Sequence, residues 1–461
     1  MALGFFICLA TIVVTVVLVA SQFTNDGGAN RQYSKEERAA KRKEIFRQTL
    51  DDRLCFRLYR LDNVLFAKLH NILLQKVSES ECLPLFMQLA IFLDYIAWAP
   101  SFDRQRTTFK LSGELITKAR SQVRSAIMKD VYPQFVKEPD QKGLKEDDLP
   151  EKDWRKFRRF AKCVGCIDGC HIKISADAET NKLFFCSRKK LVSTNAQFIS
   201  SVNKNLMFTY AYVGVEGRAS DSQSIKLAEF ASELSRIFGP TLRGTFLIGD
   251  AGYAGTFLML TPYRGVLYHL REIGLKNNNC ASGNAVSNMY ELFNLRHAMF
   301  RNQVERAFGV MKKRFKILVT GIEGLNLSET WDTIYCCVAI HNFIRSHISD
   351  VNTNCDIQRY SERLDEKTVN EEILRELDLN ADRQAKDLQD ESPLASGLQS
   401  PQPPQLTNNN ATFANASVWR DTIARQMWDD YQQELNPQQQ QQQQQQQKKK
   451  KKKTNTSPSR S

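Results

Sequence analysis

Apolar residues recur at intervals of three and four positions between residues 34 and 133, which is the spacing of helices with one buried face. The clearest run comprises Phe56, Leu58, Leu61, Val64, Leu65, Leu69, Ile72 and Leu73. A second apolar run spans residues 85–97, and Ser112 can cap a further helix with its hydroxyl group. The core-facing positions of that helix are Leu115, Ile116, Ala119, Val123 and Ile127. The pattern predicts a helical region over residues 31–136.

The helix after Ser112 also has a polar face. Its side chains are Lys118, Arg120, Gln122 and Arg124. A short capped helix with basic outer residues, behind another helix and a turn, is what a helix-turn-helix DNA reader requires. We therefore expect Lys118, Arg120 and Arg124 to face DNA, although a solvated amphipathic helix fits the same spacing.

The pattern changes after residues 137–152, a charged stretch with two prolines that is interpreted as a linker. Runs rich in aromatic and β-branched residues then predict strands. They cover residues 163–174, 198–202, 206–215 and 245–248. Helical spacing returns at residues 222–238, 289–318 and 329–348. The alternation predicts an α/β layered domain over residues 153–350.

Residues 351–461 are dominated by Asn, Gln, Ser, Pro and charged side chains and end in a glutamine run and a lysine run. This composition predicts a largely disordered tail. One amphipathic island, residues 418–435, interrupts it with apolar and aromatic positions at helical spacing. They are Trp419, Ile423, Met427, Trp428 and Tyr431. We interpret the island as a docking helix, with packing back on the core as the alternative.

The chain of 461 residues is long enough for two folded units plus tails. Its formal charge of +13 favours a polyanionic partner, but the lysine run Lys448–Lys453 supplies six of the positive charges. The cysteines number 11 and are scattered, which favours reduced thiols over a disulfide framework. Cys163, Cys166 and Cys170, followed by His171, resemble a zinc-ligand set. Their apolar setting favours core thiols instead.

Residues 1–21 form an apolar segment in which Ala2–Ala20 carries no charge. Its length suits a marginal membrane anchor or a secretory signal. Basic residues between 31 and 43 follow it, so the remainder would stay on the cytoplasmic side of a membrane. The alternative is an incorrectly placed start of the reading frame.

Three acidic residues stand out by their setting. Asp168 interrupts an apolar strand, where a carboxylate is costly unless it is paired or binds a metal. Asp250 closes the apolar strand predicted at residues 245–248 and precedes a turn. Sheets of α/β proteins place ligands at such strand ends. Glu305 lies on a predicted helix and shares one face with Arg301 and Lys312.

Two strand aspartates and a helix glutamate are a plausible site for two Mg²⁺ or Mn²⁺ ions, because hard cations prefer oxygen ligands. Such a site catalyses in-line displacement at a phosphodiester. The basic neighbours Arg301, Arg306 and Lys312 are suited to neutralise phosphate. Taken singly, each acid also has a structural reading, such as an ion pair between Glu305 and Arg301 on a surface helix.

Ordered motifs across residues 55–345 resemble the PIF/Harbinger transposase nuclease, a DDE superfamily endonuclease. They are Cys166–Ile172, Gly217–Ser222, Leu247–Tyr253, Thr261–Gly265, Leu292–His297, Val304–Gly309, Lys313–Ile317 and Ala339–Phe343. The resemblance implies an RNase H-like mixed sheet flanked by helices. It places the metal-binding triad on Asp168, Asp250 and Glu305. Asp221 lies in a motif that usually reads His-Asp-Ser, and it is an additional candidate metal ligand.

The resemblance also implies a function in DNA cleavage and strand transfer at element ends, dependent on two divalent metal ions. It implies a nuclear location, a separate Myb-like DNA-binding partner and, as an open alternative, homo-oligomers. A membrane location follows only if Ala2–Ala20 is a genuine anchor. Departures from the family pattern occur at Cys170, Asn203 and Ser220, but none removes a triad acid. The rival reading is a domesticated descendant that binds DNA or protein without cutting.

Overall fold

The computed structural model describes residues 33–347 and 416–434, with gaps at 81, 140–142, 149–150, 176, 188, 203–205, 239–244, 257, 267–285 and 287. The chain divides into two compact units. In the described part, the first unit comprises residues up to 140, then 165–239 and 303–347, and the second comprises 141–164, 240–302 and 416–434. The apolar segment 1–21, Asn203 and the glutamine and lysine runs lie outside the described residues.

The first unit begins with the helical region that the sequence predicts. Its helices are α2 (Lys35–Leu50), α3 (Asp52–Tyr59), α4 (Asn63–Leu73), α5 (Leu85–Trp98), α6 (Phe102–Phe109), α7 (Gly113–Ala126), the π-helix η1 (Ile127–Val131) and α8 (Tyr132–Phe135). Ser112 caps α7 as predicted, because its hydroxyl oxygen accepts a hydrogen bond from the Leu115 N–H at 3.3 Å. Helix α5 is buried along almost its whole length and packs against α2, α3, α4, α6 and α7. Within the described residues, no helix is both long and apolar enough to cross a bilayer.

The outer face predicted for α7 is wrong at two of its basic positions. Arg120 and Arg124 are buried, whereas Lys118 is exposed. The Arg120 guanidinium lies 3.9 Å from the centre of the Tyr95 ring and donates to Gln105 Oε1 at 2.8 Å. Both arginines therefore stabilise helix packing, and only Lys118 retains the exposure that the DNA-binding prediction requires.

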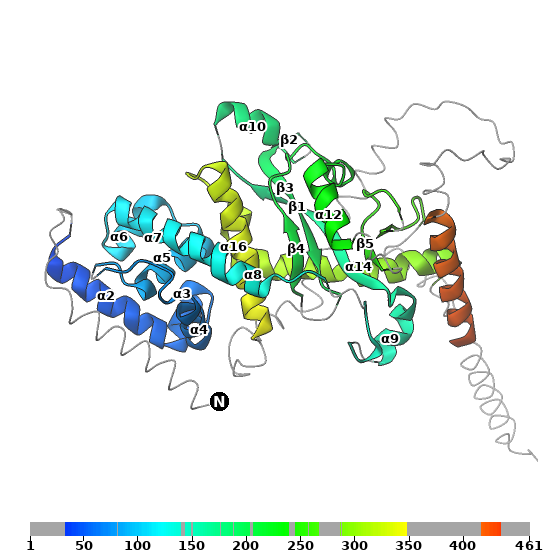
Figure 1. The fold of residues 1–461 in the computed structure, drawn as a ribbon, viewed down its shortest axis with the longest axis horizontal. Coiled ribbons are helices and arrows are strands. Elements are labelled where there is room, and N and C mark those ends of the chain that lie inside the picture. Colours follow the sequence, from blue (N-terminus) through cyan, green and yellow to red (C-terminus); the bar gives the residue numbers. More distant parts are fainter. Residues whose placement is uncertain are drawn as a thin grey trace, which may run out of the picture. The chain divides into compact units, whose positions relative to one another are not determined.

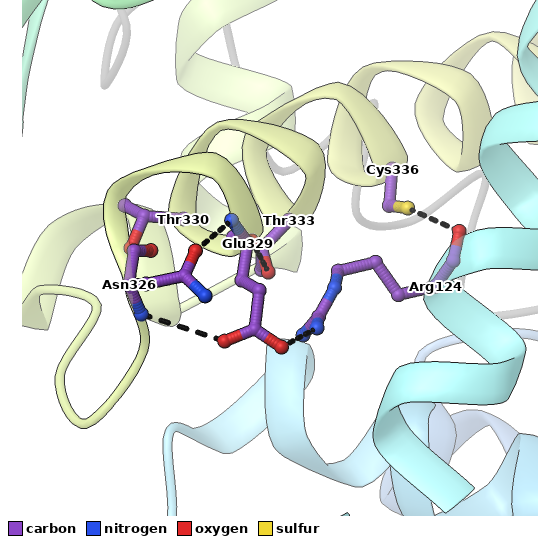
Figure 2. A network of polar contacts seen from close by, with 6 residues as sticks. All are labelled: Arg124, Asn326, Glu329, Thr330, Thr333 and Cys336. Carbon is purple, nitrogen blue, oxygen red and sulfur yellow. Dashed lines mark hydrogen bonds and ion pairs between the residues drawn. The ribbon is translucent and has the colours of Figure 1, made fainter. Parts of the chain in front are cut away.

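Arg124 joins α7 to α16 (Leu327–Ser346), as Figure 2 shows. Its guanidinium forms an ion pair with Glu329, which also accepts from the Asn326 N–H in a capping box at the start of α16. The Cys336 thiol lies 3.5 Å from the Arg124 carbonyl oxygen. A single arginine thus joins the helical region to α16, and both lie in the first unit.

Among the described residues, the sheet has six strands in the order β2-β3-β1-β5-β6, with β4 paired to β3. The strands are β1 (Cys163–Lys173), β2 (Phe185–Cys186), β3 (Leu191–Ser200), β4 (Phe208–Tyr212), β5 (Phe246–Ile248) and β6 (Met259–Leu260). Strands β1 to β4 pair antiparallel, and β5 and β6 pair parallel. Strand β1 starts in the second unit, where the Phe246 N–H donates to the Lys162 carbonyl at 3.2 Å, and continues in the first.

Helices cover both faces of the sheet in the first unit, and Figure 1 shows α12 lying over the strands. The helices after β1 are α10 (Ala178–Phe184), α11 (Asp221–Ser224), α12 (Ala228–Phe238), α14 (Met289–Arg314), α15 (Ile317–Thr320) and α16. Phe230 of α12 stacks on Tyr212 of β4 at 4.8 Å between ring centres. Phe308 of α14 packs from the other face, 5.6 Å from Phe208. The mixed sheet between helices confirms the predicted α/β class and is consistent with an RNase H-like nuclease fold.

The second unit begins with the stretch interpreted as a linker. It forms a short 3₁₀ helix η2 (Glu146–Asp148), then α9 (Glu151–Phe157) and the 3₁₀ helix η3 (Arg158–Phe160). The Leu144 N–H donates to the Ala161 carbonyl at 2.7 Å, which closes the stretch onto the start of β1. Residues 416–434 form a helix in the same unit, close to the predicted 418–435, and we call it the C-terminal helix.

Candidate active site

Asp168 lies inside β1 on the face that α14 covers. Side chains alternate along a strand, so Asp168 shares its face with Cys166 and Cys170, while Gly169 and His171 point to the opposite face. In the antiparallel register, Asp168 is opposite Phe198 of β3, and directly opposed residues share a face. Asp168 is half-buried, and its Oδ1 accepts the Gly169 N–H at 3.0 Å.

Glu305 reaches the same face of the sheet through its helix. Phe308, three residues further along α14, lies 5.2 Å from Phe198 between ring centres. Residues three apart on a helix are surface neighbours, so Glu305 and Phe308 project from the same side of α14. The structure therefore brings Asp168 and Glu305 onto one face of the first unit, with the Phe198–Phe308 contact beside them.

Asp221 lies against the opposite face of β1. Its Oδ1 accepts hydrogen bonds from the side-chain amides of Asn195 and Gln197, both at 3.1 Å. Gln197 is opposite Gly169 in the register, and a Cβ at Gly169 would lie 2.1 Å from the Asp221 carboxylate. Because residue 169 is a glycine, the Asp221 carboxylate can pack directly against β1 at the position after Asp168. This geometry favours a role for Asp221 in holding β1 in place.

Asp250 follows β5 in the second unit and begins a tight turn. Its Oδ1 accepts the Gly252 N–H at 2.8 Å, and its carbonyl oxygen accepts the Tyr253 N–H at 3.3 Å. The Arg264 guanidinium donates to the Ala251 carbonyl at 2.8 Å. Asp250 is half-buried, at the carboxyl end of its strand as the sequence predicts.

Two of the sequence motifs in this unit bind each other. The Asn294 side chain accepts the Tyr263 N–H at 2.8 Å and donates to the Tyr263 carbonyl at 2.9 Å. His297 Nε2 lies 3.1 Å from the Leu260 carbonyl oxygen. Burial lowers the pKa of His297 to about 3, so the ring is neutral and donates to that carbonyl. The start of α14 therefore fixes the segment that follows β6 and returns to the Asp250 turn.

Basic side chains accompany Glu305 on α14. Arg301, Arg306 and Lys312 are half-buried, and Arg306 lies near Arg345 of α16. Burial and the neighbouring charge of Arg306 lower the pKa of Arg345 to about 10, so the Arg345 side chain remains cationic at neutral pH. The sequence reading missed Arg345, because 39 positions separate it from Arg306 and only the packing of α16 brings them together.

The residues of β1 that resemble a zinc-ligand set are divided between the two faces of the strand. Cys163, Cys166 and Cys170 are buried thiols in the hydrophobic core. His171 points to the other face of the strand, where its Nδ1 lies 2.9 Å from Ser193 Oγ. The thiols are core residues, as the apolar setting predicted.

Within the part of the chain that the structure describes, no three His, Cys, Asp or Glu side chains are grouped closely enough to hold a metal ion. Asp168 and Glu305 share a face in the first unit, and Asp250 lies in the second. The chemistry of these donors fits Mg²⁺ or Mn²⁺, since all three supply carboxylate oxygens from half-buried positions. Their grouping into one metal site stays a prediction.

The mixed sheet between helices, with carboxylates on or just after its strands, is consistent with the fold of a transposase-type nuclease. Residues 167–342 match the family model described as DDE superfamily endonuclease. The match begins one residue before Asp168 and ends at Asn342, so it includes all three predicted triad acids. No curated protein and no solved structure matches the chain.

Proposed function

We propose that this chain is a metal-dependent DNA endonuclease and strand transferase of the PIF/Harbinger type. The observation that carries the proposal is the placement of Asp168 and Glu305 on one sheet face within the segment that matches the DDE endonuclease family. Asp250, at the end of β5, is the third proposed ligand. In this family class the substrate is DNA and the cofactors are divalent metal ions.

The proposed reaction has two in-line steps. Water attacks a phosphodiester at an element end, the bond from phosphorus to the 3′ oxygen breaks, and a 3′-hydroxyl and a 5′-phosphate result. The released 3′-hydroxyl then attacks a phosphodiester of target DNA, which releases a second 3′-hydroxyl. Asp168, Asp250 and Glu305 would hold two Mg²⁺ or Mn²⁺ ions, which stabilise the attacking and leaving oxygens when bound.

The protein's cations have a separate role in this proposal. Arg306 follows Glu305 in α14 and lies near Arg345 of α16, and Lys312 lies two helical turns from Glu305. These side chains would bind the DNA phosphates and fix the strand across the carboxylates. Arg301 belongs to the same helical face. A nuclear location and a Myb-like partner that finds the element ends belong to the proposal as well.

The test is nicking of supercoiled plasmid with Mn²⁺ or Mg²⁺ by the full chain and by Asp168→Asn, Asp250→Asn and Glu305→Gln. Loss of one metal ligand removes several kcal/mol of transition-state stabilisation, so each variant should nick about a thousandfold more slowly. Glu114→Gln changes an exposed carboxylate of α7 that has no role in the proposed site, and it serves as the matched control. If the folded parent binds DNA but never nicks, even with element ends and a Myb-like partner, the chain is a domesticated DNA-binding descendant.

A further inference from the structure

The C-terminal helix packs against β5, the strand that precedes Asp250. Its apolar stripe is buried, with Ala424 and Met427 at 0% exposure. The Trp419 ring packs edge-on against Phe246 of β5 at 5.0 Å between ring centres. Trp419 also lines a small pocket with Met259 of β6. The helix is therefore part of the core of the second unit.

Two residues near the start of this helix contact Tyr263 in the segment after β6. The Tyr263 hydroxyl donates to Asp421 Oδ1 at 2.6 Å. The Arg420 guanidinium lies 4.1 Å from the centre of the Tyr263 ring and donates to the Pro262 carbonyl at 3.3 Å. Burial and the Asp421 carboxylate raise the pKa of Tyr263 above its ordinary value, which keeps the hydroxyl protonated as a donor.

Tyr263 also connects the C-terminal helix to the Asp250 turn. Asn294 of α14 holds the backbone of Tyr263 through both its N–H and its carbonyl. The next residue, Arg264, donates to the carbonyl of Ala251, which directly follows Asp250. Tyr263 is therefore linked to the turn through the next residue, Arg264, and its hydrogen bond to the Ala251 carbonyl.

The other end of the helix is held by ion pairs with residues that precede β1 in the sequence. Asp430 is 5% exposed and accepts two hydrogen bonds from Arg159, each at 2.7 Å. Arg158 completes the ion cluster at 2.9 Å. Hydrogen bonds from Arg159 hold the pKa of Asp430 below its ordinary value, so the anchor stays charged at neutral pH. Both arginines precede β1, the strand that carries Asp168.

We propose that the C-terminal helix is a positioning element of the nuclease site, in which Asp421 and Tyr263 set the turn that presents Asp250. The inference rests on the proposed function and assigns a role in it to a segment outside the matched residues 167–342. Asp421 and Tyr263 are positioning residues, because they act on Asp250 through Arg264 and Ala251. A helix that only stabilised the unit would have no selective effect on the Asp250 turn.

The experiment compares full-length Tyr263→Phe and Asp421→Asn with Arg425→Ala, an exposed position on the same helix. Tyr263→Phe removes the hydroxyl and keeps the ring beneath Arg420, so the helix remains docked. Hydrogen exchange of residues 249–256 is read first, and it should become about tenfold faster in both variants, corresponding to about 1.4 kcal/mol of local stability. Single-turnover nicking should slow about tenfold while DNA affinity changes less than twofold.

Exchange is measured without catalysis, so the two proposals fail separately. A parent that never nicks would sink the nuclease assignment, and the exchange data would still test the link from Tyr263 to the turn. Unchanged exchange at residues 249–256 in both variants, with the helix amides still protected, would overturn the positioning role. A lower Tm with unchanged exchange and unchanged nicking would overturn it as well, because it would show a purely structural helix.

Discussion

The two strand aspartates are supported in different ways. The face of β1 opposite Asp168 is covered by residues nearby in the sequence, since Asn195, Gln197 and Asp221 all follow Asp168 within 53 positions. The segment that contacts the Asp250 turn is held by a remote residue, since the hydrogen bond between Tyr263 and Asp421 spans 158 positions. The first aspartate is thus supported by sheet pairing, and the second depends on a helix beyond the family match. Changes inside the sheet and changes in the C-terminal helix should therefore affect the two aspartates separately.

The largest expected loss of stability comes from adding a methyl group at Gly169, between β1 and Asp221. Gly169→Ala places a methyl group 2.1 Å from Asp221 Oδ1 and 2.8 Å from Asn195 Oδ1, so the carboxylate must move. Overpacking of this kind costs about 1–3 kcal/mol of unfolding free energy. Urea unfolding of the first unit should show the loss, and the hydrogen bonds to Asp221 should weaken.

Gly309→Ala is the matched control for this substitution. Gly309 lies on α14, next to Phe308, and a methyl group there meets nothing within 4 Å. Alanine is the better helix former, so this variant should gain about 0.5–1 kcal/mol. Equal stability of the two alanine variants would contradict the close packing of Asp221 against β1.

The layered fold was predictable because its periodicity is local. The α/β alternation and most helix positions follow from apolar spacing, and the predicted strand at 163–174 corresponds to β1. Strand β3 was predicted only from residue 198, whereas it begins at Leu191. Its earlier half carries buried polar residues whose partners are supplied by distant segments, as Asp221 does for Asn195 and Gln197. A strand of buried polar side chains has no apolar pattern to detect.

The site was only partly predictable for the same reason. Helical spacing placed Arg120 and Arg124 on an outer face, but the partners that bury them, Tyr95 and Glu329, lie on other helices. Amphipathic spacing distinguishes apolar from polar positions and cannot identify a buried, partnered arginine. The placement of Asp221 on the face opposite Asp168 likewise depends on strand register, which sequence does not give.

Acid should affect both regions, because each holds a buried neutral histidine. Burial lowers the pKa of His341 in the first unit and of His297 in the second to about 3, below the ordinary value near 6.5. The unfolded chain therefore binds more protons between about pH 3 and 6.5, and stability falls as the pH drops through this window. By pH 5, each histidine should lower the free energy of unfolding of the protein by about 2 kcal/mol.

Urea unfolding at pH 7 and pH 5 checks this expectation. His341→Gln and His297→Gln remove the titrating group and keep a side-chain donor for the carbonyls of Leu206 and Leu260. Each variant should show a pH dependence smaller by about 2 kcal/mol than the parent, whatever its stability at pH 7. Two variants with the parent's pH dependence would show that neither histidine is neutral in the folded chain.

The smallest expected effect separates Asp221 from the metal ligands. Asp221→Asn retains an oxygen that can accept from Asn195 and Gln197, so unfolding free energy should change by less than about 1 kcal/mol. If Asp221 only holds β1, single-turnover nicking should fall by less than about fivefold, against about a thousandfold for Asp168→Asn. Asp221→Ala, which removes an acceptor shared by the buried side-chain amides of Asn195 and Gln197, should cost about 1–3 kcal/mol. A loss of nicking in Asp221→Asn as deep as in Asp168→Asn would instead make Asp221 a metal ligand and would require its carboxylate to leave the face of Gly169 when metal binds.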